Sequence, residues 1–329
     1  MKEIQSLKYQ TTVYAIPWIS LLVGSLLGGW AGEKSETLGA WLLLASALAF
    51  GLPHGAYDFW ILFDKTQNKS NKFRSLFKNL TIYLVLVILT VSIWYFLSSA
   101  ALIGFLALTV WHFGSGDAIW ENDSKYNWLL NSLGRGLLVI FAPLTFYPGE
   151  SGVVLAKLDV NSAEMLIDFA DYALVCGIFL FLLNNLFIVF HKSKINLRQQ
   201  SFIWLETIFL LIFFWLTTPL LAVTVYLVGV HSWRHFLRLN VYEQNGKLFQ
   251  SNSLWQNIKR FHQRVLPLMI LSLVGLALIF WLWQLRISDL SDKTLAYLVL
   301  LSALTVPHAI LITWTELKLN KRQQFSDIK

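Results

Sequence analysis

The stretch PLLAVTVYLVGVHSWRHFLR, residues 219–238, begins as an apolar run and ends in two histidines and two arginines. About 20 residues of α-helix, at 1.5 Å per residue, cross the roughly 30 Å hydrocarbon core of a bilayer. Similar apolar runs recur along the chain of 329 residues, of which 56% are apolar and 14% charged. Soluble domains have about half apolar and a quarter charged residues. The composition therefore excludes an ordinary soluble enzyme and predicts an integral membrane protein.

The recurring apolar runs predict an all-α fold, a polytopic integral membrane helical bundle with about ten transmembrane helices. The chain, 1–329, is interpreted as a single integral membrane domain. The candidate spans are 13–31, 37–63, 76–97, 99–120, 128–148, 170–190, 201–217, 219–238, 265–285 and 294–315.

The segments between the spans alternate in charge. Lysine and arginine gather near the amino terminus and in 64–78, 191–200 and 239–264, whereas 149–169 is acidic. Because basic loops stay on the cytoplasmic side, these basic segments and both termini are predicted to be cytoplasmic. The loop 121–127 carries both signs and does not indicate a side.

Charge and cysteine content exclude several classes of function. The formal net charge is +7, but the basic residues lie in short loops where they set orientation, so no nucleic acid partner is expected. Cys176 is the only cysteine. An internal disulfide, a four-cysteine zinc site and an iron–sulfur cluster are therefore excluded.

Five of the seven histidines fall inside predicted spans; His191 and His262 are assigned to basic loops. An ionisable residue inside a span costs about 2–3 kcal/mol or more, so it is by default a hypothesis about function. All five lie about 12 to 17 residues, or roughly 18 to 26 Å, from the outer ends of their spans. They are predicted to share one layer of the membrane: His54, His112, His231, His235 and His308.

This spacing favours a metal site. His231 and His235 are one turn apart, so they share a helical face and can bind one ion. Neutral imidazole is a good ligand for iron and zinc. Pro53 and Pro307 each precede a histidine and are expected to kink their helices. The glycines of Gly55-Ala56 and of Gly114-Ser115-Gly116 are expected to allow close helix approach.

Charged and aromatic residues surround the histidines in sequence. Asp58 is expected to accept the second ring N–H of His54, and Asp117 is a weaker candidate for this role beside His112. Arg234 lies inside a span and needs an acidic partner, for which Asp58, Asp117 or Glu206 is available. The aromatic residues near the histidines suggest a lined substrate cavity: Trp60, Trp111, Trp233 and Trp314.

The sequence lacks the residues that several classes of metal enzyme require. No glutamate follows His231 or another histidine as a zinc protease requires, and the paired-histidine boxes of membrane desaturases are missing. A mononuclear Fe(2+) centre with three or four imidazoles and open positions for oxygen activation fits best. Two alternatives stay open. One is a transporter in which the histidines relay protons, and the other is a haem-binding electron-transfer subunit.

Four motifs resemble those of the Brp/Blh family, the bacteriorhodopsin-related membrane β-carotene 15,15'-dioxygenases. They occur in the family's order over about residues 40 to 315: Gly51-Leu-Pro-His-Gly-Ala-Tyr-Asp58, Trp111-His-Phe-Gly-Ser-Gly-Asp117, His231-Ser-Trp-Arg-His235 and Pro307-His-Ala-Ile-Leu311. The resemblance implies iron-dependent cleavage of the central double bond of β-carotene by O2 to two molecules of retinal. It places the catalytic iron ligands on His54, His112, His231 and His235, and leaves His308 as a further ligand or a substrate-positioning group.

The resemblance also defines the expected partners. These are β-carotene and O2 as substrates, the lipid bilayer, and a rhodopsin to which retinal is handed, although direct transfer is left open. An all-trans C40 carotenoid is about as long as the hydrocarbon core is thick, so it can enter from lipid. The iron is expected to supply the oxygen chemistry with no general acid or base. If the source is bacterial, the long apolar helices favour the inner membrane.

Overall fold

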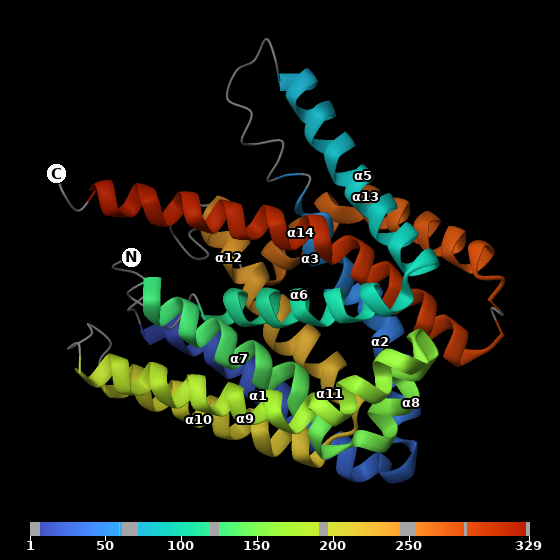
Figure 1. Cartoon of the computed structure of the whole chain (residues 1–329). Coiled ribbons are helices and arrows are strands. Elements are labelled where there is room, and N and C mark those ends of the chain that lie inside the picture. The colour runs from blue at the N-terminus through green and yellow to red at the C-terminus, as the bar shows by residue number, and fades with distance from the viewer. Residues whose placement is uncertain are drawn as a thin grey trace.

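The computed structural model describes residues 7–58, 60, 72–118, 125–190, 197–243, 254–285 and 288–326, and their regular structure is entirely helical (Figure 1). In chain order the elements are α1 (Leu7–Ala31), η1 (Gly32–Lys34), α2 (Ser35–Ala49), α3 (Gly51–Ala56), α5 (Lys72–Phe96), α6 (Ser98–Ala118), α7 (Lys125–Phe146), α8 (Pro148–Leu158), α9 (Val160–Phe190), α10 (Leu197–Leu216), α11 (Pro219–Val225), the π-helix η2 (Tyr226–Ser232), α12 (Trp233–Glu243), α13 (Leu254–Leu282) and α14 (Leu290–Ser326).

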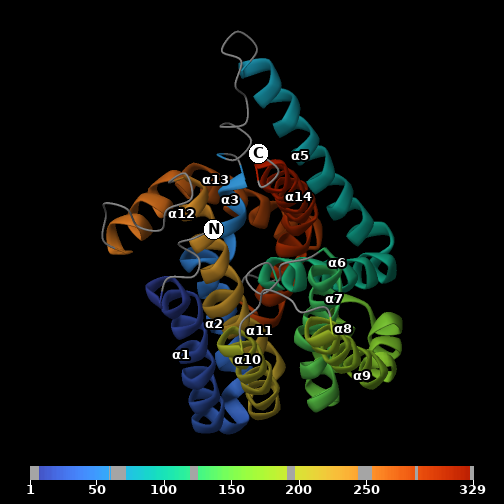
Figure 2. The same ribbon diagram turned by 90° about the vertical axis from the view of Figure 1, so that its left-hand side faces the viewer.

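The predicted membrane bundle is confirmed. Eight stretches of the described residues are long and apolar enough to cross a membrane. One of these, Thr12–Ala56, contains both α1 and α2, which form an antiparallel hairpin (Figure 2). The predicted span 201–217 falls on α10, whose apolar part is shorter. The described residues of each of the ten predicted spans are therefore mostly helical, and the chain is a multi-pass membrane protein. Residues 59, 61–63, 119 and 120 of these spans lie outside the described residues.

The predicted start of the span 170–190 is wrong. The acidic segment 149–169, predicted as a loop, forms α8 and the first turns of α9, so α9 begins at Val160 and not near residue 170. The hydropathy pattern did not predict this helix, because acidic residues interrupt the apolar run without interrupting the backbone hydrogen bonds. Pro148 at the first turn of α8 suits a helix start, where no N–H partner is needed.

The positions of several helix ends agree with the predicted topology, in which both termini lie on one side. Figure 1 places the start of α1 and the end of α14 on the same side of the molecule. The end of α6 and the start of α7 point toward that side as well. Between these two helix ends, residues 119–124 lie outside the described residues, and the predicted loop 121–127 overlaps the start of α7 at Lys125. The cytoplasmic assignment of that side stays a prediction.

The two prolines beside histidines behave differently. Helix α2 ends at Ala49 and α3 begins at Gly51, with Phe50 at φ −136° between them. The helix is therefore interrupted where Pro53 removes a helical hydrogen bond. Helix α14 continues through Pro307 as one helix. The sequence also gave no sign of the π-helix that carries His231, an irregularity often found at functional sites.

Helices α6 and α7 cross with their backbones in close contact. A Cβ atom added at Gly114 would lie within 1.8 Å of the Ser132 carbonyl oxygen, and one at Gly136 within 1.9 Å of the Val110 carbonyl oxygen. The predicted close approach at Gly114 is confirmed, whereas Gly55 has nothing within 4 Å of such an atom. Because His112 lies two residues before Gly114, this crossing fixes its depth and direction.

Asp159 ties α6 to α9 outside the predicted spans. Its carboxylate accepts hydrogen bonds from the Ser98 and Ser99 hydroxyls, at 2.7 and 2.8 Å, and from the Ser162 backbone N–H at 2.8 Å. The Ser162 N–H, followed by the Ser98 hydroxyl, lowers the pKa of Asp159 to about 2. These bonds favour the carboxylate, so their contribution to stability is present above the ordinary aspartate pKa and is lost as the pH falls through about 2.

The buried apolar side chains form two clusters. One contains Leu102, Phe141 and Tyr226, and the other contains Tyr57, Trp233 and Phe236. Large apolar side chains are also exposed on the outer faces of the helices, as expected where lipid replaces water. Both clusters belong to one bundle in Figures 1 and 2, and the assignment of a single domain stays a prediction.

We predict that Gly114→Ala destabilises the protein by about 1–3 kcal/mol, because the added methyl group collides with backbone and forces α6 from α7. Thermal unfolding in detergent would measure this. Gly104→Ala is the matched control on the same helix, since nothing lies within 4 Å of its added atom. Equal melting temperatures for the two variants would contradict the close crossing.

Candidate metal centre

Five imidazole rings from five elements converge in the interior of the bundle. His54 comes from α3, His112 from α6, His231 from η2, His235 from α12 and His308 from α14. All five are buried, the most exposed being His54 at 7%. The predicted shared layer of histidines is therefore a single cluster of rings.

Within the cluster, four rings form a closed circuit of neighbours. Ring centroids are 5.6 Å apart for His54 and His231, 4.7 Å for His231 and His112, 4.8 Å for His112 and His308, and 5.2 Å for His308 and His54. His235 lies beside this circuit, 5.6 Å from His54 and 5.2 Å from His308. Phe113 lies 4.5 Å from the His231 ring and closes that side with an apolar surface.

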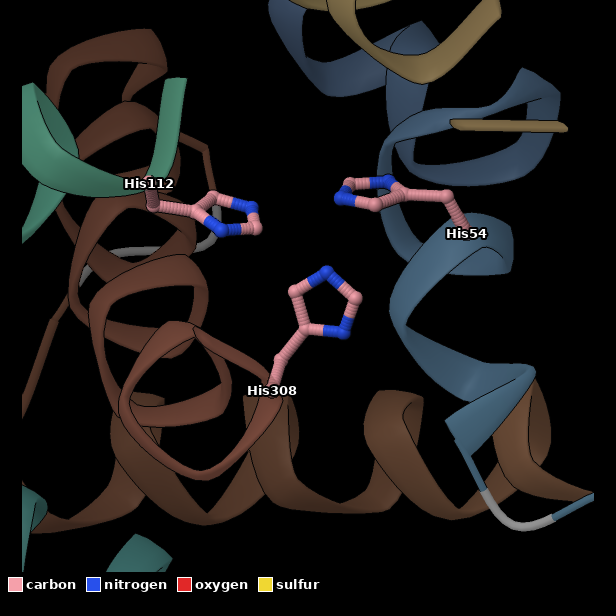
Figure 3. Close-up of side chains that lie close together, drawn as sticks. All are labelled: His54, His112 and His308. Carbon is pink, nitrogen blue, oxygen red and sulfur yellow. The ribbon is translucent and has the colours of Figure 1, made fainter. Parts of the chain in front are cut away.

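Three of the histidines have ring nitrogens within 4.8 Å of one another: His54, His112 and His308. Figure 3 shows these rings entering from three different elements and turning toward a common point. Across the same region, the Nε2 atoms of His112 and His231 lie 3.1 Å apart. Segments separated by hundreds of residues in sequence thus bring nitrogen ligands together.

Asp58 contacts a different histidine from the one predicted. Both of its carboxylate oxygens lie 2.8 Å from Nδ1 of His308, and the Tyr83 hydroxyl donates to it at 3.2 Å. His54 instead directs its Nδ1 at the Phe50 carbonyl oxygen, 2.8 Å away, with Ser232 Oγ at 3.3 Å. The local carbonyl is closer to His54 because the helix break leaves Phe50 at the start of α3.

His235 meets an arginine on its own helix. The Nη2 atom of Arg238 lies 3.2 Å from Nδ1 of His235. A guanidinium group can only donate, so Nδ1 accepts and the ring proton of neutral His235 is on Nε2. That Nε2 is buried and has no hydrogen-bond partner within the described part of the chain.

A second buried cluster, of charged side chains, lies against the histidines. Arg234, fully buried, donates to Glu206, and Arg135 also donates to Glu206. The Tyr226 hydroxyl donates to Asp117, whose other oxygen lies 3.9 Å from Nδ1 of His231 and 4.0 Å from Arg234. Glu206 is therefore the main acidic partner of Arg234, and Asp117 faces His231 and not His112.

His262 was assigned to a loop, and this is wrong. It lies on α13, where its Nε2 is 2.6 Å from the Ala49 carbonyl oxygen and its Nδ1 is 3.0 Å from the Ile258 carbonyl oxygen. Pro53 has no N–H to give to the Ala49 carbonyl. His262 therefore takes the place of the lost helical hydrogen bond and ties α13 to the segment that carries His54. The available signal in the sequence was Pro53 itself, because a proline leaves the carbonyl group four residues before it, that of Ala49, in need of another donor.

The four tryptophans predicted to line a cavity have other contacts in the structure. Indole N–H groups of Trp60, Trp111 and Trp233 donate to Arg264 O, Thr313 Oγ1 and Thr12 O, at 3.0 to 3.2 Å. Trp314 is 43% exposed. These contacts place three of them at helix junctions, and their contact with substrate stays a prediction.

The histidine cluster fits a metal ion. Two imidazole nitrogens bound to one ion at about 2.0–2.1 Å stand roughly 2.8–3.4 Å apart at angles between square and tetrahedral. The 3.1 Å separation of the His112 and His231 Nε2 atoms matches this. Nε2 of His308 is buried without a hydrogen-bond partner among the described residues, while a carboxylate holds its other nitrogen. A carboxylate–histidine pair of this kind is typical of metal sites.

Comparisons with known proteins show the family to which the chain belongs. The family model described as beta-carotene 15,15'-dioxygenase matches residues 45–316. The chain is 25% identical to the probable beta-carotene 15,15'-dioxygenase Blh of Halobacterium salinarum, over 92% of this chain and 91% of that protein. It is 27% identical to a beta-carotene 15,15'-dioxygenase of the uncultured marine bacterium 66A03, over 83% and 92%. No solved structure gives a significant match.

We predict that Glu206→Gln destabilises the protein by about 3–5 kcal/mol, because it leaves Arg135 and Arg234 buried with less negative charge. Unfolding in detergent would measure the change. Glu164→Gln, at an exposed position of α9, is the matched control and should have little effect. If both variants unfold alike, the charged cluster does not stabilise the bundle.

Proposed function

The chain belongs to the β-carotene 15,15'-dioxygenase family of enzymes, and on this premise we propose that it cleaves the central 15,15' double bond of β-carotene with O2 to give two molecules of all-trans-retinal. The observation that carries the proposal is the buried cluster of five histidines inside a bundle of apolar helices. The cluster offers nitrogen ligands where an apolar substrate can reach them.

The reaction balances without a further reductant. One carbon–carbon double bond breaks, and each of its two carbons gains one oxygen atom as an aldehyde. Both oxygen atoms come from one O2. No proton has to be removed from β-carotene or added to it, so the chain needs no general acid or base, and the buried histidines are free to act as ligands.

We propose iron as the metal. Fe(2+) bound by neutral imidazoles would supply O2 binding and one-electron chemistry. Of the four ligands that the resemblance implies, His54, His112 and His231 have geometry that suits ligation. His54 donates from Nδ1, so its lone pair is on Nε2, and the other two bring their Nε2 atoms together. His235 differs because Arg238 donates to its ring.

The bundle itself suits an apolar substrate. Its helices expose large apolar side chains to lipid, so β-carotene can approach from the bilayer without crossing water. Around the cluster, Phe113 and the neighbouring buried apolar residues keep water out, which protects a reactive site from side reactions. The selection of the central bond would follow from how deep the histidines lie in the membrane.

The contacts between the rings argue against a haem protein. A haem held by two imidazoles separates their ligating nitrogens by about 4 Å and needs a slot for the porphyrin between them. The Nε2 atoms of His112 and His231 are 3.1 Å apart, with the ring of His308 packed beside His112. Retinal would be released into the same membrane, where a rhodopsin could receive it. In a bacterial source that would be the inner membrane.

We predict that cells that make β-carotene lose their orange colour and accumulate retinal when they express this chain. Extraction and chromatography of the pigments would measure both changes. His54→Ala, made at an equal level in the membrane, is the negative control. Intact pigment with the unaltered chain, at a membrane level comparable to that of an active relative, would contradict the proposed reaction.

We predict that the purified protein carries about one iron, and that His54→Ala and His112→Ala each lose it while remaining in the membrane. Metal analysis and membrane fractionation would check this. Chelation should abolish retinal formation, and added Fe(2+) should restore it where Zn(2+) does not, because zinc has no redox chemistry. Full activity in the zinc-loaded protein would contradict the assignment of iron.

A further inference from the structure

We propose that His308, held by Asp58, binds the metal together with His54, His112 and His231, and that His235 lies beside the metal without binding it. The proposal rests on the proposed function of the cluster as an iron site. It departs from the ligand set that the family resemblance implies, in which His235 is the fourth ligand. Three independent observations support it: the circuit of rings, the fixed orientation of His308 and the proton position on His235.

The first observation is the arrangement of the rings. Ligands of one ion surround it, so neighbouring ligand rings contact one another in turn. His54, His231, His112 and His308 do so, with centroid separations between 4.7 and 5.6 Å around the circuit. His308 thus lies between His54 and His112 and in contact with both, as a ligand of the same ion would. His235 also contacts two of these rings, His54 and His308, so its role is decided by its hydrogen bond and not by its position.

The second observation is that His308 is held ready to bind. Its Nδ1 lies 2.8 Å from both Asp58 oxygens, so it carries the proton and donates it to the carboxylate. The lone pair is then on Nε2, which is buried and has no hydrogen-bond partner in the described residues. Figure 3 shows a nitrogen of His308 directed between the rings of His54 and His112. A buried lone pair without a donor is costly unless a cation fills the space.

The third observation is the opposite state of His235. Because Arg238 donates to its Nδ1, the neutral ring has no lone pair on Nε2. Nε2–H is then buried without a hydrogen-bond partner among the described residues, and a protonated nitrogen cannot bind a metal. The same group can donate a hydrogen bond to an oxygen atom held near the metal, such as the aldehyde oxygen of the product. His235 would then orient that oxygen atom, and His308 would bind the metal.

Metal affinity separates the two roles. Apoprotein in detergent would be titrated with Fe(2+) and with Co(2+) in competition with a coloured chelator. We expect His308→Ala to lose stoichiometric binding and Asp58→Asn to bind about 10- to 100-fold more weakly, since the ring is no longer held. We expect His235→Ala to bind both metals with nearly the affinity of the unaltered chain and to form little retinal.

The visible absorption of the cobalt protein gives a second readout. Cobalt(II) bands change with the number and type of ligands, so they should move in His308→Ala and stay in place in His235→Ala. Tyr83→Phe is the matched control for Asp58, because it removes the 3.2 Å hydrogen bond to the carboxylate and keeps the carboxylate beside His308. It should change affinity far less than Asp58→Asn. If His308→Ala does not fold, Asp58→Asn carries the comparison.

The outcomes are distinct. Weak binding in the His308 and Asp58 variants with intact binding in His235→Ala supports the proposal. Lost binding in His235→Ala, or intact binding in His308→Ala, overturns it and leaves the proposed function standing. An unaltered chain that binds no iron, or His54→Ala and His112→Ala proteins that keep it, overturns the proposed iron site itself.

Discussion

A ring nitrogen inside a membrane bundle has no water to bond with, and this constraint organises the structure around the histidines. Ten nitrogens from five imidazoles must find partners in the same dry layer. Several do so through the protein: His54 bonds to the Phe50 carbonyl oxygen and His308 to Asp58. Among the others, the Nε2 atoms of His112 and His231 face each other, and Nε2 of His308 has no hydrogen-bond partner among the described residues. A cation between them would satisfy this arrangement, because it accepts several lone pairs at once.

The charged cluster next to the histidines obeys the same constraint. Arg135 and Arg234 carry two positive charges, and Asp117 and Glu206 two negative ones, so the buried group can be neutral as a whole. It joins α6, α7, α10 and α12 with directional bonds where lipid provides no hydrophobic force between helices. Since Arg234 lies between His231 and His235 in sequence, a fixed Arg234 also fixes the direction in which these two rings leave their helix.

Backbone irregularities place the histidines. The break at Phe50 turns His54 toward the centre, and His262 from α13 compensates the carbonyl that Pro53 leaves without a donor. The π-helix sets His231 apart from the regular turn that His235 occupies. Glycine at positions 114 and 136 lets α6 approach α7 until backbone meets backbone. Each irregularity occurs on an element that carries a histidine or supports one.

Most of the membrane-spanning helices and the shared layer of five histidines could be predicted from sequence. Lipid disfavours unpaired backbone groups and charges, so a membrane span must be a long apolar helix, and an ionisable residue inside it stands out. The hydrogen-bond partners of the polar side chains could not be predicted in this way. Asp58 is four residues from His54 but contacts His308, which is 250 residues away. The helical character of residues 149–158 and the position of His262 on a helix were missed, because polar residues interrupt a hydropathy pattern without breaking a helix. Sequence alone therefore determined the solvent, most of the membrane-spanning helices and the shared layer of the five histidines. Only the tertiary structure decided which nitrogen atom lies within hydrogen-bond distance of which oxygen atom. That pairing depends on how each helix is rotated about its axis and where it crosses its neighbours, and the periodicity of the sequence contains neither.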